Sequence, residues 1–245
     1  MCFHNKRING VLLSAVVILT STVRGQNIYA LEETAASSLV EITSTSIRGM
    51  GVVLEDGATI ATCAHVVDGS KWVDVNFGTH REKGYVVGIS EENDIAIARV
   101  HRKGTPFQID RSGVDRIKGE FVVAAGKNSS LNSSLSRPSM RVGAVVAYLE
   151  DGSSNLLISS ITEHGFSGGP VMDQNGCLIG ITKGDLSSSK LGSGTQVIPM
   201  WKILEVIHKA RHGNTSTFLR PVSVPMIEIP ELPELDAWMD KYHSN

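Results

Sequence analysis

Three short sequence motifs contain residues that could together hydrolyse an amide bond. They are Thr-Cys-Ala-His at His65, Asn-Asp-Ile-Ala at Asp94 and Gly-Phe-Ser-Gly-Gly at Ser167. Amide hydrolysis needs a nucleophile, a base that returns the proton to the leaving amine, and a carboxylate that fixes the tautomer of the base. A serine hydroxyl is a weak nucleophile alone, so the fold must bring Ser167 to within about 3 Å of His65.

Glycines on both sides of Ser167 suit a second need of this reaction. The tetrahedral intermediate carries an oxyanion, which backbone N–H groups must meet and which bulky side chains would obstruct. We assign the oxyanion donors to the amides of Gly165 and Ser167. The neighbouring His164 could contact substrate, but we interpret it as an exposed loop residue.

Two series of short apolar runs are expected to form the strands that position these motifs. Gly, Asp, Ser or Asn separates most of the runs, as is typical of antiparallel barrels or sandwiches. The two series predict two β-barrels packed side by side, joined by a polar linker over residues 101–119. One helix is expected to begin near Pro199 and to end at Gly213. The runs are residues 39–43, 51–54, 59–63, 72–77, 84–89 and 95–100, then 121–125, 142–149, 156–159, 177–182 and 195–198.

Composition and charge exclude several other classes of protein. The 245 residues are 41% hydrophobic, enough to bury the core of one large domain or two small ones. A net charge of −2 with no basic block argues against a nucleic-acid partner. Three cysteines cannot build a disulfide framework, so we expect Cys63 and Cys177 to be core residues, with a bridge between them as the alternative.

The two ends of the chain differ in composition from the body. Residues 1–25 combine a basic start, a mostly apolar stretch over 8–23 and a small-residue exit, which predicts a secretory signal peptide. An uncleaved membrane anchor and a buried helix are the alternatives, so contact with a membrane is expected only without cleavage. Residues 213–245 are rich in proline and acidic residues and predict an extended acidic arm, which is a solvated tail or binds a partner.

Eight motifs, which follow one another in order between about residues 39 and 212, resemble those of the trypsin/chymotrypsin-fold serine proteases and, among them, the HtrA (DegP)-like proteases. The resemblance implies a mostly β fold of two six-stranded antiparallel β-barrels packed side by side, with a C-terminal helix. It places a protease domain at 36–212, with barrels at about 36–105 and 118–200 and the helix at 200–212. The matching motifs are residues 49–53, 62–69, 93–97, 120–126, 142–146, 165–170, 175–181 and 194–199.

Three departures from the family pattern stand out. Phe166 occupies the position where HtrA-like proteases usually have Asn and trypsin-like ones Asp, so its side chain must find a packing site instead of a hydrogen bond. The usual Gly-Asn-Pro-like turn is Gly-Lys-Asn at Gly126. HtrA proteases generally carry a PDZ domain of about 90 residues, and too few residues follow His212 for one.

Substrate selection is predicted from position relative to Ser167. By the resemblance, Ile161 and Thr162 should form the base of the primary pocket, where trypsin-like enzymes have an acid. We therefore expect a small or medium apolar residue on the acyl side of the cleaved bond. A carboxylate of Asp185 facing the pocket would reverse that preference. The pocket wall is expected to comprise Thr182, Lys183, Gly184 and Asp185.

Together these observations predict a secreted or exported serine endopeptidase that acts on proteins or peptides through His65, Asp94 and Ser167. A catalytically inactive binding or chaperone module and an esterase are the alternatives. No cofactor is implied. No metal is expected either, because Lys209 stands between His208 and His212 where a metalloprotease would place its glutamate. The resemblance suggests a homotrimer, although the N-terminal arm that would build one is not recognisable.

Overall fold

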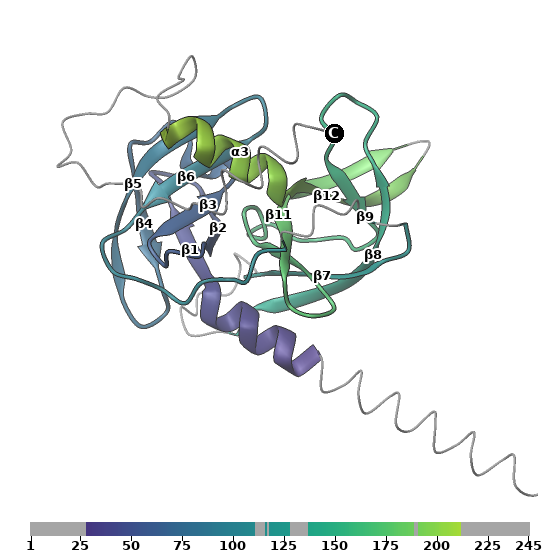
Figure 1. Cartoon of the computed structure of the whole chain (residues 1–245), viewed down its shortest axis with the longest axis horizontal. Helices are drawn as coiled ribbons and strands as arrows, with labels where there is room; N and C mark the ends of the chain where they lie inside the picture. Colours follow the sequence, from purple (N-terminus) through teal and green to yellow (C-terminus); the bar gives the residue numbers. More distant parts are fainter. Residues whose placement is uncertain (1–27, 111–115, 117, 128–136, 189–190, 212–245) are drawn as a thin grey trace, which may run out of the picture.

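The computed structural model describes residues 28–110, 116, 118–127, 137–188 and 191–211, which form two closed antiparallel barrels of six strands each (Figure 1). The mostly β fold with a C-terminal helix, expected from the sequence, is confirmed. The first barrel contains β1 (Leu39–Thr43), β2 (Arg48–Val53), β3 (Thr59–Thr62), β4 (Trp72–Asn76), β5 (Arg81–Ser90) and β6 (Ile95–Arg99). The second contains β7 (Phe121–Gly126), β8 (Ser139–Tyr148), β9 (Leu156–Ile158), β10 (Pro170–Asp173), β11 (Leu178–Ser188) and β12 (Gly192–Pro199).

Every strand has a paired neighbour on each side, although β11 extends beyond its pairing with β10. In the first barrel, β1 pairs with both β2 and β4, and in the second β7 pairs with both β8 and β10. Strands such as β3 and β6 are buried along their whole length, which suits their β-branched and small residues. Gly51 lets β2 approach its neighbours, since a Cβ there would lie 2.7 Å from Ile60. The small residues therefore allow tight closure around the apolar interior.

A buried ion pair fixes the turn between β2 and β3. Arg99 on β6 contacts the carboxylate of Asp56, and its Nη1 donates to Thr59 Oγ1 at 2.6 Å. Burial alone would raise the pKa of Asp56, but hydrogen bonds from Thr59 and Ala58 together with the Arg99 charge outweigh it and lower that pKa. The charged form of Asp56 therefore stabilises this end of the barrel.

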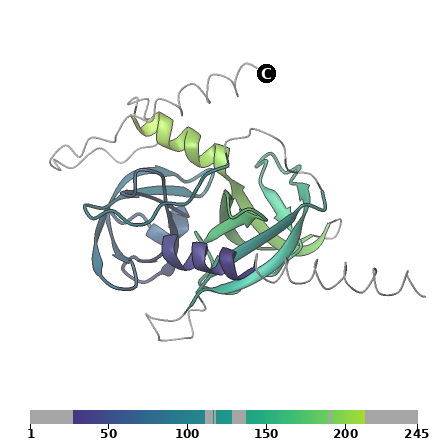
Figure 2. The same cartoon turned by 60° about the horizontal axis from the view of Figure 1, so that its bottom comes forward.

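Two helices pack on the barrels on opposite sides of the molecule (Figures 1 and 2). Helix α3 (Met200–Arg211) contacts β5 and β6 of the first barrel as well as β11 and β12 of the second. Its apolar face buries Ile203 and Leu204. The helical residues 28–38, which the sequence analysis did not predict, bury Leu31 and Ala35. Both helices thus add apolar contacts across the barrel pair.

The segment after the first barrel is more than a polar linker. Phe107 is 1% exposed, and its N–H donates to Val53 O at 2.9 Å. Ile109 forms a β-bridge with Leu178 of β11. These contacts tie the connection to both barrels.

The predicted signal peptide at 1–25 and the acidic arm at 213–245 lie outside the described residues. Within the part that the structure describes, no helix is long and apolar enough to cross a membrane. Cys63 is buried and Cys177 partly buried, and both are free thiols, so the alternative of a bridge between them is wrong.

Candidate active site

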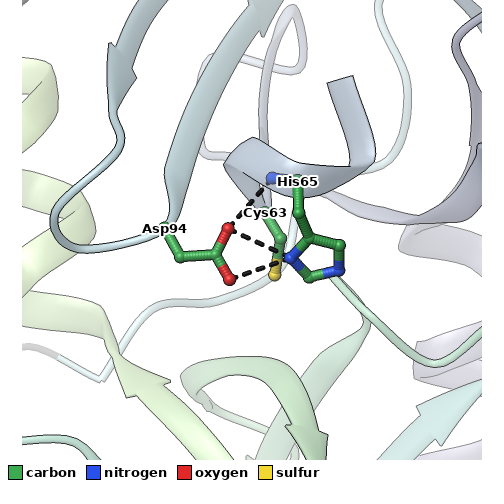
Figure 3. Close-up of side chains that lie close together, drawn as sticks. All are labelled: Cys63, His65 and Asp94. Atoms are coloured by element: carbon green, nitrogen blue, oxygen red, sulfur yellow. Dashed lines mark hydrogen bonds and ion pairs between the residues drawn. The ribbon is translucent and has the colours of Figure 1, made fainter. Parts of the chain in front are cut away.

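His65 and Asp94 meet beside the short helix α2 (Ala64–Val67), which follows β3 directly. His65 Nδ1 lies 2.9 Å from Asp94 Oδ2 and 3.0 Å from Oδ1, and the backbone N–H of His65 donates to Oδ1 at 3.0 Å (Figure 3). A carboxylate only accepts, so Nδ1 carries the proton and Nε2 is left as the acceptor. The Asp94 side chain is 12% exposed and that of His65 44%, so the orienting carboxylate is sheltered while the imidazole faces solvent.

The backbone at Asp94 is strained to make this contact. Its φ is +58°, in the left-handed region that few residues other than glycine adopt. The same residue's carbonyl accepts the N–H of Ala64 at 3.1 Å, so backbone and side chain both hold α2. This backbone conformation therefore helps to fix the position of the His65 imidazole.

Ser167 lies on the loop before β10 and is docked on the first barrel. Its carbonyl accepts the N–H of Met50 at 2.7 Å, and a Cβ at Gly49 would come within 2.8 Å of that oxygen. On the other side, Gly168 N–H donates to Thr182 O at 2.8 Å. The serine backbone is thus held between β2 and β11, on the same side of the barrel interface as α2.

The hydroxyl of Ser167 points to a backbone carbonyl in this structure. Ser167 Oγ donates to Lys183 O at 3.3 Å. Within the described residues it makes no hydrogen bond to His65. The structure therefore brings His65 and Asp94 together and holds Ser167 in the facing loop, with its side chain in another orientation.

The residues before Ser167 form a tight turn that leaves two amides unpaired. Phe166 N–H donates to Glu163 O at 3.1 Å, and Gly165 at the third position has a φ of +100°, as a type II turn requires. Neither Gly165 N–H nor Ser167 N–H has an acceptor within the part of the chain that the structure describes. Two free donors beside the serine fit the predicted oxyanion site.

The apolar side chain of Phe166 is packed in the interior, as expected. It is 0% exposed and lies against Gly126 at the end of β7. His164, in contrast, is exposed, as expected.

Two of the predicted pocket residues, Thr162 and Asp185, meet at one carboxylate oxygen. Asp185 Oδ1 accepts the N–H of Thr162 at 3.1 Å and its hydroxyl at 3.0 Å. Thr195 Oγ1, which the sequence analysis did not single out, lies 3.1 Å from the same oxygen. Ile161 is 57% exposed, whereas Thr162 is buried. Asp185 on β11 is thereby linked to the loop residue expected at the pocket base.

The remaining predicted wall residues border the serine loop. Thr182 O accepts from Cys63 Sγ at 3.3 Å and from Gly168 N–H, and Lys183 O accepts from Ser167. Gly184 follows, at a register shift between β11 and β12. This stretch therefore contacts residues on both sides of the barrel interface.

Cys63, His65 and Asp94 form the one group of possible metal donors found among the described residues, with donor atoms within 4.8 Å of one another. Burial and, less strongly, the Asp94 charge raise the pKa of the Cys63 thiol well above its ordinary value, which disfavours the thiolate that a metal would need. His65 Nδ1 and the thiol already have protein partners. The donor set therefore fits a metal ion poorly. His212, one of the two helix histidines considered above, lies outside the described residues.

The chain is similar to known peptidases. The family described as trypsin-like peptidase domain matches residues 49–181. Serine protease HTRA1 of Xenopus tropicalis is 27% identical over 180 residues, which are 69% of this chain and 37% of that protein. A probable periplasmic serine protease Do/HhoA-like of Haemophilus influenzae is 27% identical over 156 residues, 61% of this chain and 34% of that protein.

The chain thus spans little more than a third of the length of these two relatives. Among solved structures, the serine endoprotease from Yersinia pestis superposes with a TM-score of 0.64 at 21% identity, over 76% of this chain and 67% of that one, which shows a shared fold. With a family match over more than half of its residues, the chain belongs to the trypsin-like peptidase family and is related to the HtrA/Do serine proteases.

Proposed function

We propose that the protein is a serine endopeptidase in which Ser167 is the nucleophile, His65 the general base and Asp94 the residue that orients it. The observation that carries the proposal is the contact of His65 Nδ1 with both Asp94 oxygens, at 2.9 and 3.0 Å. Family membership supports the same roles, because His65, Asp94 and Ser167 occur in the order and in the motifs that are typical of the family.

In the proposed first stage, Ser167 forms a covalent acyl-enzyme. Its hydroxyl rotates from Lys183 O toward His65 Nε2, a rotamer change that takes picoseconds to nanoseconds. Nε2 takes the proton as Oγ attacks the substrate carbonyl carbon, and the new oxyanion accepts from the amides of Gly165 and Ser167. The imidazolium, stabilised by Asp94, then gives its proton to the leaving amine as the C–N bond breaks.

In the second stage, water replaces the amine. His65 takes a proton from the water, the resulting hydroxide adds to the acyl carbon, and the proton returns to Ser167 Oγ as the acid product leaves. Asp94 stays ionised in both stages, since its role is to hold the Nδ1–H and to balance the positive imidazolium.

We infer that the substrates are proteins or peptides, because an extended chain can pair with strand backbone beside the site. The apolar preference predicted from the sequence depended on Asp185 facing away from the pocket. Its Oδ1 reaches both the N–H and the hydroxyl of Thr162, the residue expected at the pocket base. This contact favours an Asp185 carboxylate that faces the pocket. We therefore propose that the enzyme prefers a Lys or Arg side chain on the acyl side of the cleaved bond.

Labelling by a fluorophosphonate probe tests the enzyme proposal on the purified full chain. The probe should modify the wild type and the control Ser37→Ala, whose exposed serine lies on the helical residues 28–38. Ser167→Ala and His65→Ala should abolish labelling. If the folded wild type stays unlabelled, the assignment of a working nucleophile is wrong.

The orientation of the Ser167 hydroxyl favours one second candidate, a non-catalytic binding or chaperone module. Its hydrogen bond to Lys183 O would then persist, and the protein would bind unfolded polypeptides without cleaving them. An unlabelled protein that suppresses aggregation of a denatured substrate would identify this function. Comparing ester and peptide substrates separates the esterase alternative.

We propose further that the protein is exported, on the composition of residues 1–25. One relative carries a periplasmic name, which agrees with export. Cell fractionation and sequencing of the mature N-terminus test this, with Gly25 expected as the last residue removed. The trimer suggested by the family resemblance is tested by light scattering on the same material.

A further inference from the structure

We propose that Arg141 is a positioning residue that holds the oxyanion turn, residues 163–166, in its working shape. The inference rests on the proposed function, since it assigns a role in the same site. It follows from a contact pattern in which one guanidinium touches both ends of that turn.

The last residue of the turn, Phe166, is held by backbone hydrogen bonds to Glu163 and Gly169 and by burial of its ring. Phe166 is 0% exposed, and a Cβ at Gly126 would lie 2.6 Å from its Cγ and 2.9 Å from its Cα. The ring therefore rests directly on the β7 backbone, which only a glycine at 126 allows. An aromatic ring has no hydrogen-bonding group of this kind, so a directional contact to it must come through its π face.

Arg141 supplies the missing directional contact. It pairs with Ala124 in the β7–β8 register, which puts its side chain on the same face of the sheet as that of Ala124 and of position 126, two residues on. Its guanidinium carbon lies 5.6 Å from the centroid of the Phe166 ring, within the range of a cation–π contact. The guanidinium thus caps the ring that rests on Gly126.

The same guanidinium also holds the first residue of the turn. Arg141 Nη2 forms an ion pair with the Glu163 carboxylate, and Nη1 donates to Met140 O at 3.2 Å. Glu163 is the residue whose carbonyl accepts Phe166 N–H to close the turn. Fixing both ends fixes the peptide between His164 and Gly165, and with it the direction of the Gly165 N–H.

The strength of this arrangement is moderate and depends on salt. The Arg141 and Glu163 side chains are 35% and 41% exposed, so the ion pair is weak and screened by salt, and the cation–π contact adds a comparable amount. We expect Arg141→Met to lower kcat about three- to tenfold and to leave KM within about twofold, because the oxyanion forms only in the transition state.

The test uses the full chain with Arg141→Met, Arg141→Lys and Glu163→Gln, and with Arg137→Met as the matched control. Arg137 is an arginine just before β8 whose ion pair with Glu32 is also exposed, so it controls for loss of a surface charge. Arg141→Lys should recover activity only in part, since an ammonium lacks the planar fork of arginine. Raising the salt from about 0.05 to 0.5 M should lower wild-type kcat toward that of Arg141→Met, whose own kcat should change little.

Hydrogen exchange of the amides at 163–168 is the second readout and needs no turnover. It should accelerate in Arg141→Met and Glu163→Gln and stay unchanged in Arg137→Met. A wild type without labelling would overturn the proposed function but leave this exchange difference in place. Exchange and kcat that are unchanged in Arg141→Met, or changed equally in Arg137→Met, would overturn the role of Arg141.

Discussion

Replacing Gly126 by alanine should disturb both the stability of the second barrel and the reactivity of Ser167. The added Cβ would sit 2.6 Å from Phe166 Cγ and 2.9 Å from its backbone Cα, so the ring cannot simply swing aside and the turn must shift. Overpacking of this kind costs about 1–3 kcal/mol in the free energy of unfolding, a sizeable part of the about 5–15 kcal/mol of a typical domain. A shift of the turn also misdirects the Gly165 N–H, so fluorophosphonate labelling should slow at least tenfold.

Urea denaturation and labelling rates measure the two effects on the same variant. Ser139→Ala, at the position paired with Gly126 across β7 and β8, is the matched control and should change neither. In a double-mutant cycle, Gly126→Ala with Phe166→Ala should lose less stability than the two single variants together, because Phe166→Ala removes the Cγ and Cδ1 that the methyl group would meet. Unchanged stability and labelling in Gly126→Ala would refute the reasoning that the ring on the β7 backbone holds the turn.

Three further predictions concern single carboxylates. Asp56→Asn should cost about 3 kcal/mol in the free energy of unfolding at pH 7, because it removes the carboxylate that balances the charge of a buried arginine. Since folding lowers the pKa of Asp56, this loss, measured by urea denaturation, should shrink as the pH falls below 3.8, and a constant loss would contradict it. Asp94→Asn should lower kcat by about four orders of magnitude by favouring the wrong tautomer of His65, with circular dichroism unchanged. Asp185→Asn should shift cleavage of a peptide panel from Lys or Arg toward small apolar residues; a wild type that already prefers apolar residues would refute the assigned role of Asp185.

Most of the fold follows from local signals in the sequence. The run at Leu39–Thr43 is β1 with the same bounds, since Val40 and Ile42 alternate with polar residues and serines flank the run. Strand β10, Pro170–Asp173, was not among the predicted runs, because it is four residues long and follows the glycines of the serine motif directly. The helical residues 28–38 escaped prediction because only Leu31 and Ala35 mark the buried face, too few for a helical period.

The candidate site shows a different limit. His65, Asp94 and Ser167 could be proposed from residue type and order, because the chemistry demands those groups. Arg141 and Thr195 could not, since their contacts join strands distant in sequence and leave no local pattern. Phe166 was noticed as an unusual residue, but its anchor on Gly126 emerges only when the second barrel closes.

The docking of Ser167 on Met50 has a consequence for the order of events during synthesis. In a chain made from its N-terminus, the segments that carry His65 and Asp94 leave the ribosome well before residue 167. The N–H of Met50 gains its acceptor, the carbonyl of Ser167, only when the second barrel forms. In the proposed mechanism, a half-made chain therefore holds the base without the nucleophile, and hydrolytic activity can begin only after the last barrel strands have closed.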